Sequence, residues 1–103
     1  MIARTTAIAL ACVVSSAASA TAQTGFGEGG AIYDTHCASC HGLDGVPNLP
    51  GTPDFSRGES LLKSDAELID SIRYGISSMP GFDHAIDREG LLDVVLYIRL
   101  LQR

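Results

Sequence analysis

Apolar residues recur at helical intervals in the segment 65–74, in the second half of the chain. Its aliphatic side chains stand three and four positions apart, with polar residues between them. Ser64 and Glu67 have the spacing of a capping box, in which two side chains satisfy free N–H groups at a helix start. Gly75 is the type of residue that ends a helix. The pattern therefore predicts a helix over residues 65–74.

A second helical pattern runs to the end of the chain. Its aliphatic residues follow the same period: Leu91, Leu92, Val94, Val95, Ile98 and Leu101. Asp87 is placed to cap the first turn, and Arg99 and Arg103 lie near the C-terminal end, where the helix dipole favours positive charge. We predict a last helix that begins after Asp87.

The remaining segments predict little regular structure. Residues 23–30 are rich in glycine and suggest a flexible entry, followed by a short helix around residues 31–33 that ends near Cys37. Residues 42–57 hold three of the four prolines and predict a long ordered loop, which in a small domain needs something to wrap around. No alternating strand pattern and no internal repeat is visible, so the sequence predicts an all-α domain with long loops.

The first 22 residues have the composition of a secretory signal peptide. One positive charge at Arg4 precedes a short apolar run, and small residues follow it with A-x-A-like cleavage sites at 18–20 and 20–22. The apolar run is shorter than a membrane-spanning helix needs. Lipid attachment at Cys12 is an alternative, disfavoured because alanine stands where lipoprotein sites usually have leucine. We therefore expect a cleaved signal peptide over 1–22, one domain over 23–103, and a periplasmic or otherwise exported protein.

Charge and size narrow the functions available to this domain. The chain has 103 residues with 7 basic and 12 acidic side chains, and cleavage removes only Arg4 among them, which leaves six basic against twelve acidic residues. Nucleic acids and anionic membrane surfaces are poor partners for such a protein. A mature domain of about 80 residues is near the size at which natural domains recruit disulfides, metals or cofactors.

The remaining cysteines form the motif Cys-Ala-Ser-Cys-His at residues 37–41. This C-x-x-C-H spacing is typical of haem attachment, in which Cys37 and Cys40 add to the two vinyl groups and His41 ligates the iron. Three alternatives remain: a dithiol redox pair, a local disulfide, and a zinc site that also uses His36. A dithiol pair usually accompanies a βαβ pattern, and zinc requires further ligands at characteristic spacing, so we favour haem.

The second axial ligand is predicted to be Met79, which lies in a loop between the two predicted helices. It could instead fill a gap in the core, as methionine often does. His84 and His36 are rival ligands, although an isolated histidine is more often a surface residue. The second ring nitrogen of His41 needs a hydrogen-bond acceptor that fixes the ring, and the carbonyl of Pro47 is suitably spaced.

These motifs together resemble the class I cytochrome c family, in particular its small bacterial monohaem members. Matching positions before the haem motif and in the last helix are Gly29, Ile32, Tyr33, Leu92, Val95, Leu96 and Tyr97. Residues 45–49 resemble the family's proline loop, and residues 72–75 resemble the approach to its methionine ligand. The resemblance covers about residues 29–101 and implies a cytochrome c fold, with three to five short helices around one covalent haem c and a first helix that crosses the last.

Two features depart from the family pattern. The chain has no tryptophan, which some members place near a haem propionate, and it lacks the lysine-rich face of mitochondrial relatives. Arg57 and Arg73 are candidates for neutralising the propionates, although such arginines are usually solvated.

The function expected from these residues is single-electron transfer, not catalysis. Histidine and methionine ligands would leave no vacant position on the iron. Expected partners are redox proteins, with a dehydrogenase as donor and an oxidase or reductase as acceptor; the acidic charge predicts salt-sensitive encounters. The alternatives are a haem-based sensor from which Met79 detaches, an electron-transfer subunit of a dehydrogenase complex, and a haem-free domain with a disulfide or metal.

Overall fold

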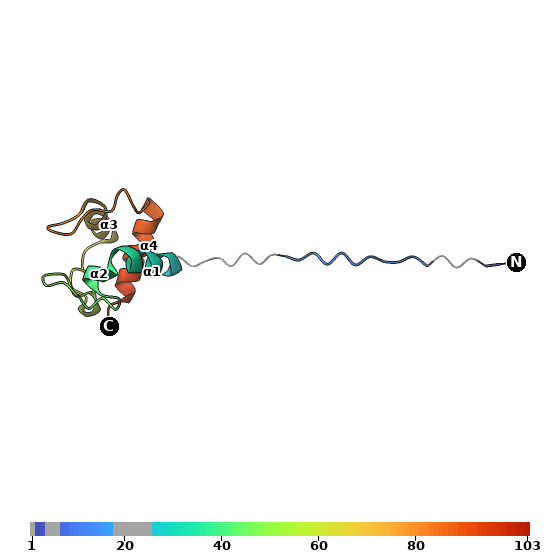
Figure 1. Cartoon of the computed structure of the whole chain (residues 1–103), viewed down its shortest axis with the longest axis horizontal. Coiled ribbons are helices and arrows are strands. Elements are labelled where there is room, and N and C mark those ends of the chain that lie inside the picture. The colour runs from blue at the N-terminus through green and yellow to red at the C-terminus, as the bar shows by residue number, and fades with distance from the viewer. Residues whose placement is uncertain (1, 4–6, 18–25) are drawn as a thin grey trace.

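Helices make up the regular structure of the computed structural model, which describes residues 2–3, 7–17 and 26–103. The elements in chain order are α1 (Phe26–His36), α2 (Ala38–His41), the 3₁₀ helix η1 (Phe55–Arg57), α3 (Asp65–Tyr74) and α4 (Arg88–Leu100), as Figure 1 shows. Within these described ranges the only extended pairing is an isolated bridge between Ile76 and Met79. The prediction of an all-α fold is confirmed.

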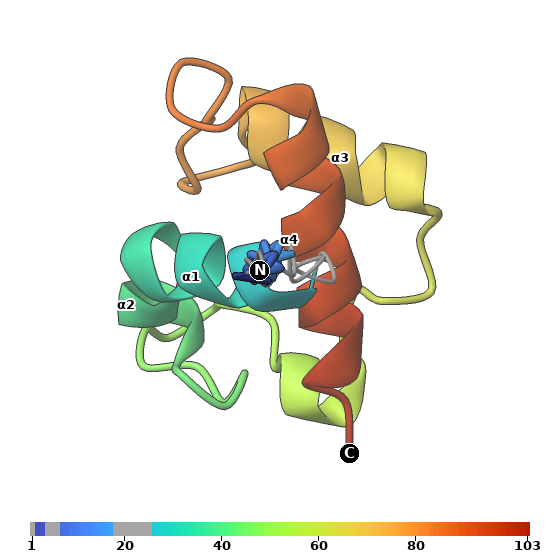
Figure 2. The ribbon, with the colours of Figure 1, turned by 90° about the vertical axis from the view of Figure 1, so that its right-hand side faces the viewer.

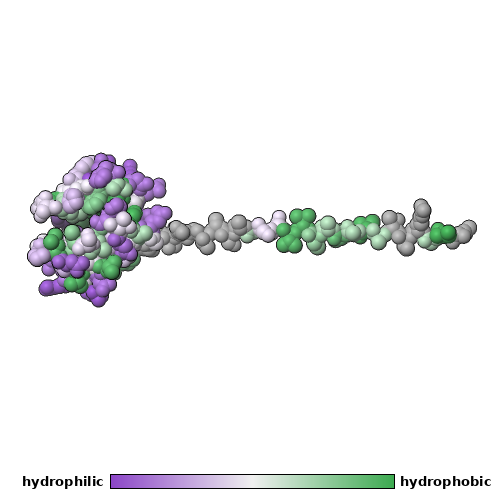
Figure 3. Space-filling model, viewed as in Figure 1, coloured by the Kyte–Doolittle hydropathy of each residue, from purple (hydrophilic) through white to green (hydrophobic). Residues whose placement is uncertain are grey.

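The N-terminal segment contributes no helix or strand where it is described. Residues 7–17 are exposed, and Figure 3 shows apolar side chains gathered along them, whereas much of the folded part is hydrophilic on the face shown. The proposed cleavage sites within 18–22, and the proposed start of the domain at residue 23, lie outside the described residues. No helix in the described part of the chain is long and apolar enough to cross a membrane.

Helix α1 begins earlier than its glycine content predicts. The flexible entry expected over residues 23–30 is corrected for residues 26–30, which are helical. A Cβ at Gly29 would collide with the backbone carbonyl of Asp93 in α4, and a Cβ at Gly30 would press on the ring of Tyr97. The two glycines thus permit a close approach of α1 to α4, and this packing outweighs their low helix propensity.

The crossing of α1 over α4 is the centre of the fold, and Figure 2 shows α1 passing across the middle of α4. The rings of Tyr33 and Tyr97 meet there with centroids 5.3 Å apart. The crossing implied by the family resemblance is therefore present. Leu92, which the family resemblance places at this contact, is instead 42% exposed. The fully buried α4 residues are Leu91, Val94 and Val95.

Helix α3 has the bounds that the sequence predicts. The Ser64 hydroxyl accepts a hydrogen bond from the Glu67 N–H, and the Glu67 carboxylate accepts one from the Ser64 N–H, so the capping box is formed. Gly75 follows with φ of 84°, a conformation that glycine adopts readily. The α3 residues Leu68 and Ile72 face the core.

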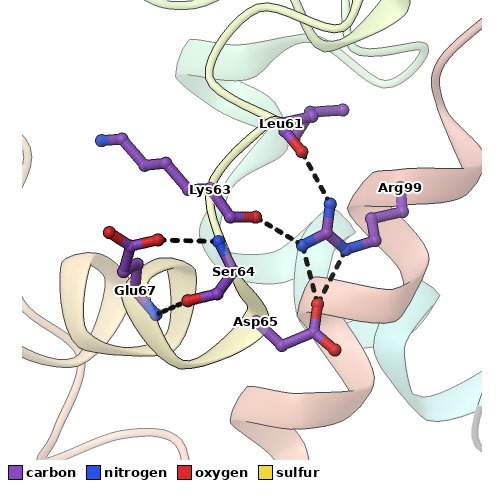
Figure 4. A network of polar contacts seen from close by, with 6 residues as sticks. All are labelled: Leu61, Lys63, Ser64, Asp65, Glu67 and Arg99. Carbon is purple, nitrogen blue, oxygen red and sulfur yellow. Dashed lines mark hydrogen bonds and ion pairs between the residues drawn. The ribbon is translucent and has the colours of Figure 1, made fainter.

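Arg99 joins α4 to the segment before α3 (Figure 4). Its guanidinium donates hydrogen bonds of 2.8 Å to the carbonyls of Leu61 and Lys63 and to a carboxylate oxygen of Asp65. Since one planar group contacts three points of one turn, it holds this turn in register with α4.

Candidate functional site

The cysteine and histidine side chains of residues 37–41 lie on a single helical turn. Helix α1 ends at His36, and Cys37 is the N-cap of α2; its N–H donates to the Tyr33 carbonyl at 2.8 Å. The N–H groups of Cys40 and His41 both donate to the Cys37 carbonyl, at 3.2 and 2.9 Å. Residues three and four apart share a helix face, so Cys37 lies on the same side as Cys40 and as His41.

A buried tyrosine fixes the residue that follows this turn. The Tyr33 hydroxyl donates a 2.6 Å hydrogen bond to the carbonyl of Gly42, and Tyr33 is fully buried. Burial is the main cause that raises its pKa, so the hydroxyl stays neutral and remains a donor. Gly42 has φ of 79°, and a Cβ there would collide with the Val46 carbonyl. The end of α2 is thus locked to α1.

The His41 imidazole is enclosed by protein on one face and one edge. It is 8% exposed and stacks on the Phe55 ring, with centroids 4.5 Å apart and an angle of 9° between the planes. Burial lowers the pKa of His41, and the Pro53 carbonyl partly opposes this effect. The ring is therefore neutral near pH 7, the form that ligates a metal.

The carbonyl that acts on the imidazole differs from the one that the sequence favoured. The sequence favoured Pro47, but the carbonyl that acts on His41 in the structure is that of Pro53. The path of the loop accords with this: the N–H groups of Asn48 and Leu49 turn back to the Cys40 carbonyl, and the chain then continues to Pro53. Three prolines in this loop made the choice ambiguous from spacing alone.

The Nδ1 atom of His41 is buried and makes no hydrogen bond of standard geometry, although the Pro53 carbonyl is close enough to influence it. Because Nδ1 is enclosed, Nε2 is the nitrogen left to bind a metal. A small movement of this carbonyl or ring would complete the hydrogen bond that metal-bound histidines usually make through their other nitrogen.

The two thiols differ in exposure. Cys37 is buried, whereas Cys40 is exposed, and both are free. Burial, and to a smaller extent the nearby Cys40, raises the pKa of the Cys37 thiol to about 11. Dithiol oxidoreductases instead lower the pKa of a reactive cysteine, so this environment does not suit that alternative.

The zinc alternative gains no support from the described residues. They contain no group of three or more His, Cys, Asp or Glu side chains that could hold a metal ion. His36, the fourth ligand considered from the sequence, packs on the Phe82 ring at a centroid distance of 5.5 Å.

Met79 lies in a tight loop between α3 and α4. It exchanges backbone hydrogen bonds with Ile76 at 2.9 and 3.1 Å, and its side chain is half-buried against the core. Gly75 and Gly81 permit the tight path, because a Cβ on either would press on neighbouring backbone atoms. The loop is also held to α3, since the Phe82 N–H donates to the Ile72 carbonyl at 2.9 Å.

The other candidate residues differ in exposure and in their contacts. His84 is exposed, and the His36 ring packs on the Phe82 ring. The Arg73 guanidinium pairs with Asp83 at 2.7 Å, and Arg57 is exposed. Neither arginine is committed by the structure to a propionate.

This arrangement fits a haem attached through two thioethers. Cys37 and Cys40 lie on the same turn as His41, whose ring is neutral and whose Nδ1 is enclosed, which leaves Nε2 to bind a metal. The family described as "Cytochrome C oxidase, cbb3-type, subunit III" matches residues 25–98, which is more than half of the chain. The chain belongs to this family of c-type cytochromes.

Two relatives agree with this membership. Cytochrome c-551 of Halorhodospira halophila is 36% identical over 64 residues, which are 60% of this chain and 78% of that protein. The solved structure of the KustC0563 c-type cytochrome has a TM-score of 0.66 and 28% identity, and the match covers 73% of this chain and 98% of that one. The chain is thus a small class I c-type cytochrome and an electron carrier, and its family implies a covalently bound haem c.

Sequence reasoning did not identify Pro53 and Phe55 as site residues. Both stand in the segment Thr-Pro-Asp-Phe at residues 52–55, beyond the proline loop that the sequence pointed to. In the sequence, the pair is visible only as a proline followed closely by an aromatic residue. This pattern indicates no role before the fold places the two residues against His41.

Proposed function

We propose that this cytochrome is an exported single-electron carrier with one haem c, attached at Cys37 and Cys40 and ligated by His41 and Met79. The observation that carries the proposal is the buried, neutral His41 imidazole on the same turn as both cysteines. The haem iron, when bound, supplies one-electron redox chemistry, and a methionine ligand raises its potential.

The residues of the chain have distinct parts in this mechanism. The Nε2 atom of His41 would bind the iron, and a hydrogen bond from Nδ1 to the nearby Pro53 carbonyl would fix the ring and increase its basicity. The glycines on either side of Met79 keep its loop tight, so the thioether is held ready as a ligand. The closely packed α1, α3 and α4 limit rearrangement during electron transfer.

Export is part of the same proposal. The apolar segment 7–17 and the small residues after it support a signal peptide over residues 1–22, which leaves the domain 23–103 in the periplasm. The haem-attaching thiols suit a protein matured outside the cytoplasm. Cleavage would also remove Cys12, so that no free cysteine remains beside the haem.

The partners proposed are redox proteins that present positive charge. A mature domain with six basic and twelve acidic residues is attracted to basic surfaces, and this attraction weakens as salt increases. A dehydrogenase as donor and an oxidase or reductase as acceptor fit this requirement. Nucleic acids do not.

An absorption spectrum with haem staining of a denaturing gel tests the proposal. The full chain is expressed with the c-type haem maturation machinery and exported. We expect covalent haem, a low-spin spectrum in both oxidation states, and the weak far-red band of methionine-to-ferric-iron charge transfer. Absence of haem from the gel would overturn the proposal and favour the disulfide or metal domain.

The sixth ligand is tested by Met79→Leu, with His84→Ala and His36→Ala as matched controls. Loss of the far-red band in Met79→Leu alone supports Met79 as the ligand. Loss in a histidine variant, or its persistence in Met79→Leu, contradicts it. Carbon monoxide that binds the reduced wild-type protein would favour the sensor.

A second candidate function follows from the description of the matching family. That family is described as a subunit of a cbb3-type oxidase, so the domain could act as an electron-entry subunit of an oxidase instead of a free shuttle. Fractionation of the source cell into membranes and soluble extract, followed by haem staining, separates the two functions. A haem-stained band of this size in the soluble fraction favours the free shuttle. Co-migration of the band with an oxidase favours the subunit.

A further inference from the structure

Phe55 makes an unusual contact with the His41 imidazole. The two rings lie almost parallel, at 9°, with centroids 4.5 Å apart, and both residues are buried, at 7% and 8% exposure. The other aromatic pairs found in the described residues are tilted by 50° and 58°. Parallel stacking is therefore specific to this pair and not a general feature of the core.

Phe55 is held by contacts that do not involve α2. Its N–H donates a 2.9 Å hydrogen bond to the Gly45 carbonyl, and it begins η1, whose last residue is Arg57. The N–H of Arg103 donates at 2.9 Å to the carbonyl of Ser56, which joins η1 to the C-terminal end of the chain. The phenyl ring is thus a fixed surface against which the imidazole rests.

The imidazole is then restrained from three sides. Helix α2 fixes the His41 backbone, the Pro53 carbonyl lies near the ring, and Phe55 covers one face. Rotation of the imidazole about the axis of a bond from Nε2 would tilt it away from the parallel contact. The Phe55 contact opposes this rotation across a ring face, whereas a single carbonyl restrains one edge.

We infer that Phe55 is a positioning residue that sets the plane of the His41 imidazole and, through it, the electronic asymmetry of the haem iron. The inference rests on the proposed ligation by His41. The plane of an axial imidazole determines which iron orbital it overlaps, so a change of plane redistributes unpaired spin in the ferric protein. Partners of a metal-bound histidine act on the metal in this way.

The experiment compares the ferric holoprotein with Phe55→Leu and Phe55→Tyr. Leucine removes the ring, whereas tyrosine keeps it. Leu91→Val is the matched control, because it removes one methylene from another fully buried site in α4. The measurements are the proton NMR shifts of the haem methyl groups, the EPR g values, and unfolding by denaturant.

We expect Phe55→Leu to change the spread of the methyl shifts and the g values, and Phe55→Tyr to retain the wild-type pattern. Leu91→Val should lower stability with both spectra unchanged. Phe55→Met is a second ring-free variant if Phe55→Leu yields no haem protein.

Two failures can be distinguished. Wild-type protein without covalent haem overturns the proposed function, and with it this inference. Wild-type protein with haem, together with ring-free variants that are less stable but keep both spectra, overturns the inference alone and reduces Phe55 to a core residue.

Discussion

The hydroxyl of Tyr33 offers a sharp test of how the haem motif is held to α1. Tyr33→Phe removes one oxygen and leaves the ring in contact with Tyr97. The lost interaction is a buried 2.6 Å hydrogen bond to the Gly42 carbonyl. The substitution therefore isolates a single polar contact between α1 and the end of α2.

The loss of stability in Tyr33→Phe depends on which hydrogen bonds the Gly42 carbonyl still accepts. The Gly42 carbonyl also accepts a 3.1 Å hydrogen bond from the Gly45 N–H, so the variant does not leave it without any partner. The variant therefore avoids the full free-energy cost of a buried carbonyl with no hydrogen-bond partner. We expect a loss of about 1 kcal/mol, near the net value of one intramolecular hydrogen bond. For a domain of this size, that corresponds to a fall in Tm of about 4–8 °C.

The assay is denaturant unfolding of the ferric holoprotein, followed by circular dichroism. The midpoint should fall with an unchanged m-value, because the compactness of the two states is the same. Tyr74→Phe is the matched control, since it removes a hydroxyl from an exposed tyrosine and should be neutral. If Tyr33→Phe is no less stable than Tyr74→Phe, the hydrogen bond does not stabilise the turn and the reasoning is refuted.

Three further predictions concern the packing around this centre, and each is measured by denaturant unfolding. Gly29→Ala should lower the free energy of unfolding by about 1–3 kcal/mol, because the added Cβ meets the α4 backbone. At Gly27 an added Cβ meets open space, so Gly27→Ala should be neutral or stabilising. Equal effects of the two substitutions would contradict the packing argument. Arg99→Gln should lower the free energy of unfolding by about 1–2 kcal/mol through its lost carbonyl contacts. Asp65→Asn weakens the partly exposed ion pair and should cost less than about 1 kcal/mol. A larger loss in Asp65→Asn than in Arg99→Gln would reverse this assignment. Ser64→Ala should cost about 1 kcal/mol through the lost cap, and an unchanged midpoint would show that the capping box contributes nothing.

The parts of the fold that could be predicted are those set by neighbouring residues. The capping box of Ser64 and Glu67 and the helix stop at Gly75 are local signals, and α3 has the bounds that they give. The start of α1 could not be predicted in the same way. Glycine disfavours a helix in isolation, and only contact with α4, about sixty residues further along the chain, makes Gly29 suitable there.

The same distinction separates the predicted site residues from the missed ones. Cys37, Cys40 and His41 form a contiguous motif of the kind that haem attachment requires, so their pattern is visible without a structure. The groups that lie against His41 come from a loop that ends more than ten residues later, and several loop paths would satisfy its prolines. The fold selects one path, in which the N–H groups of residues 48 and 49 donate hydrogen bonds to the Cys40 carbonyl and the following segment reaches the His41 ring. Spacing can therefore identify the ligand of such a site, while the neighbours that tune the ligand depend on loop closure.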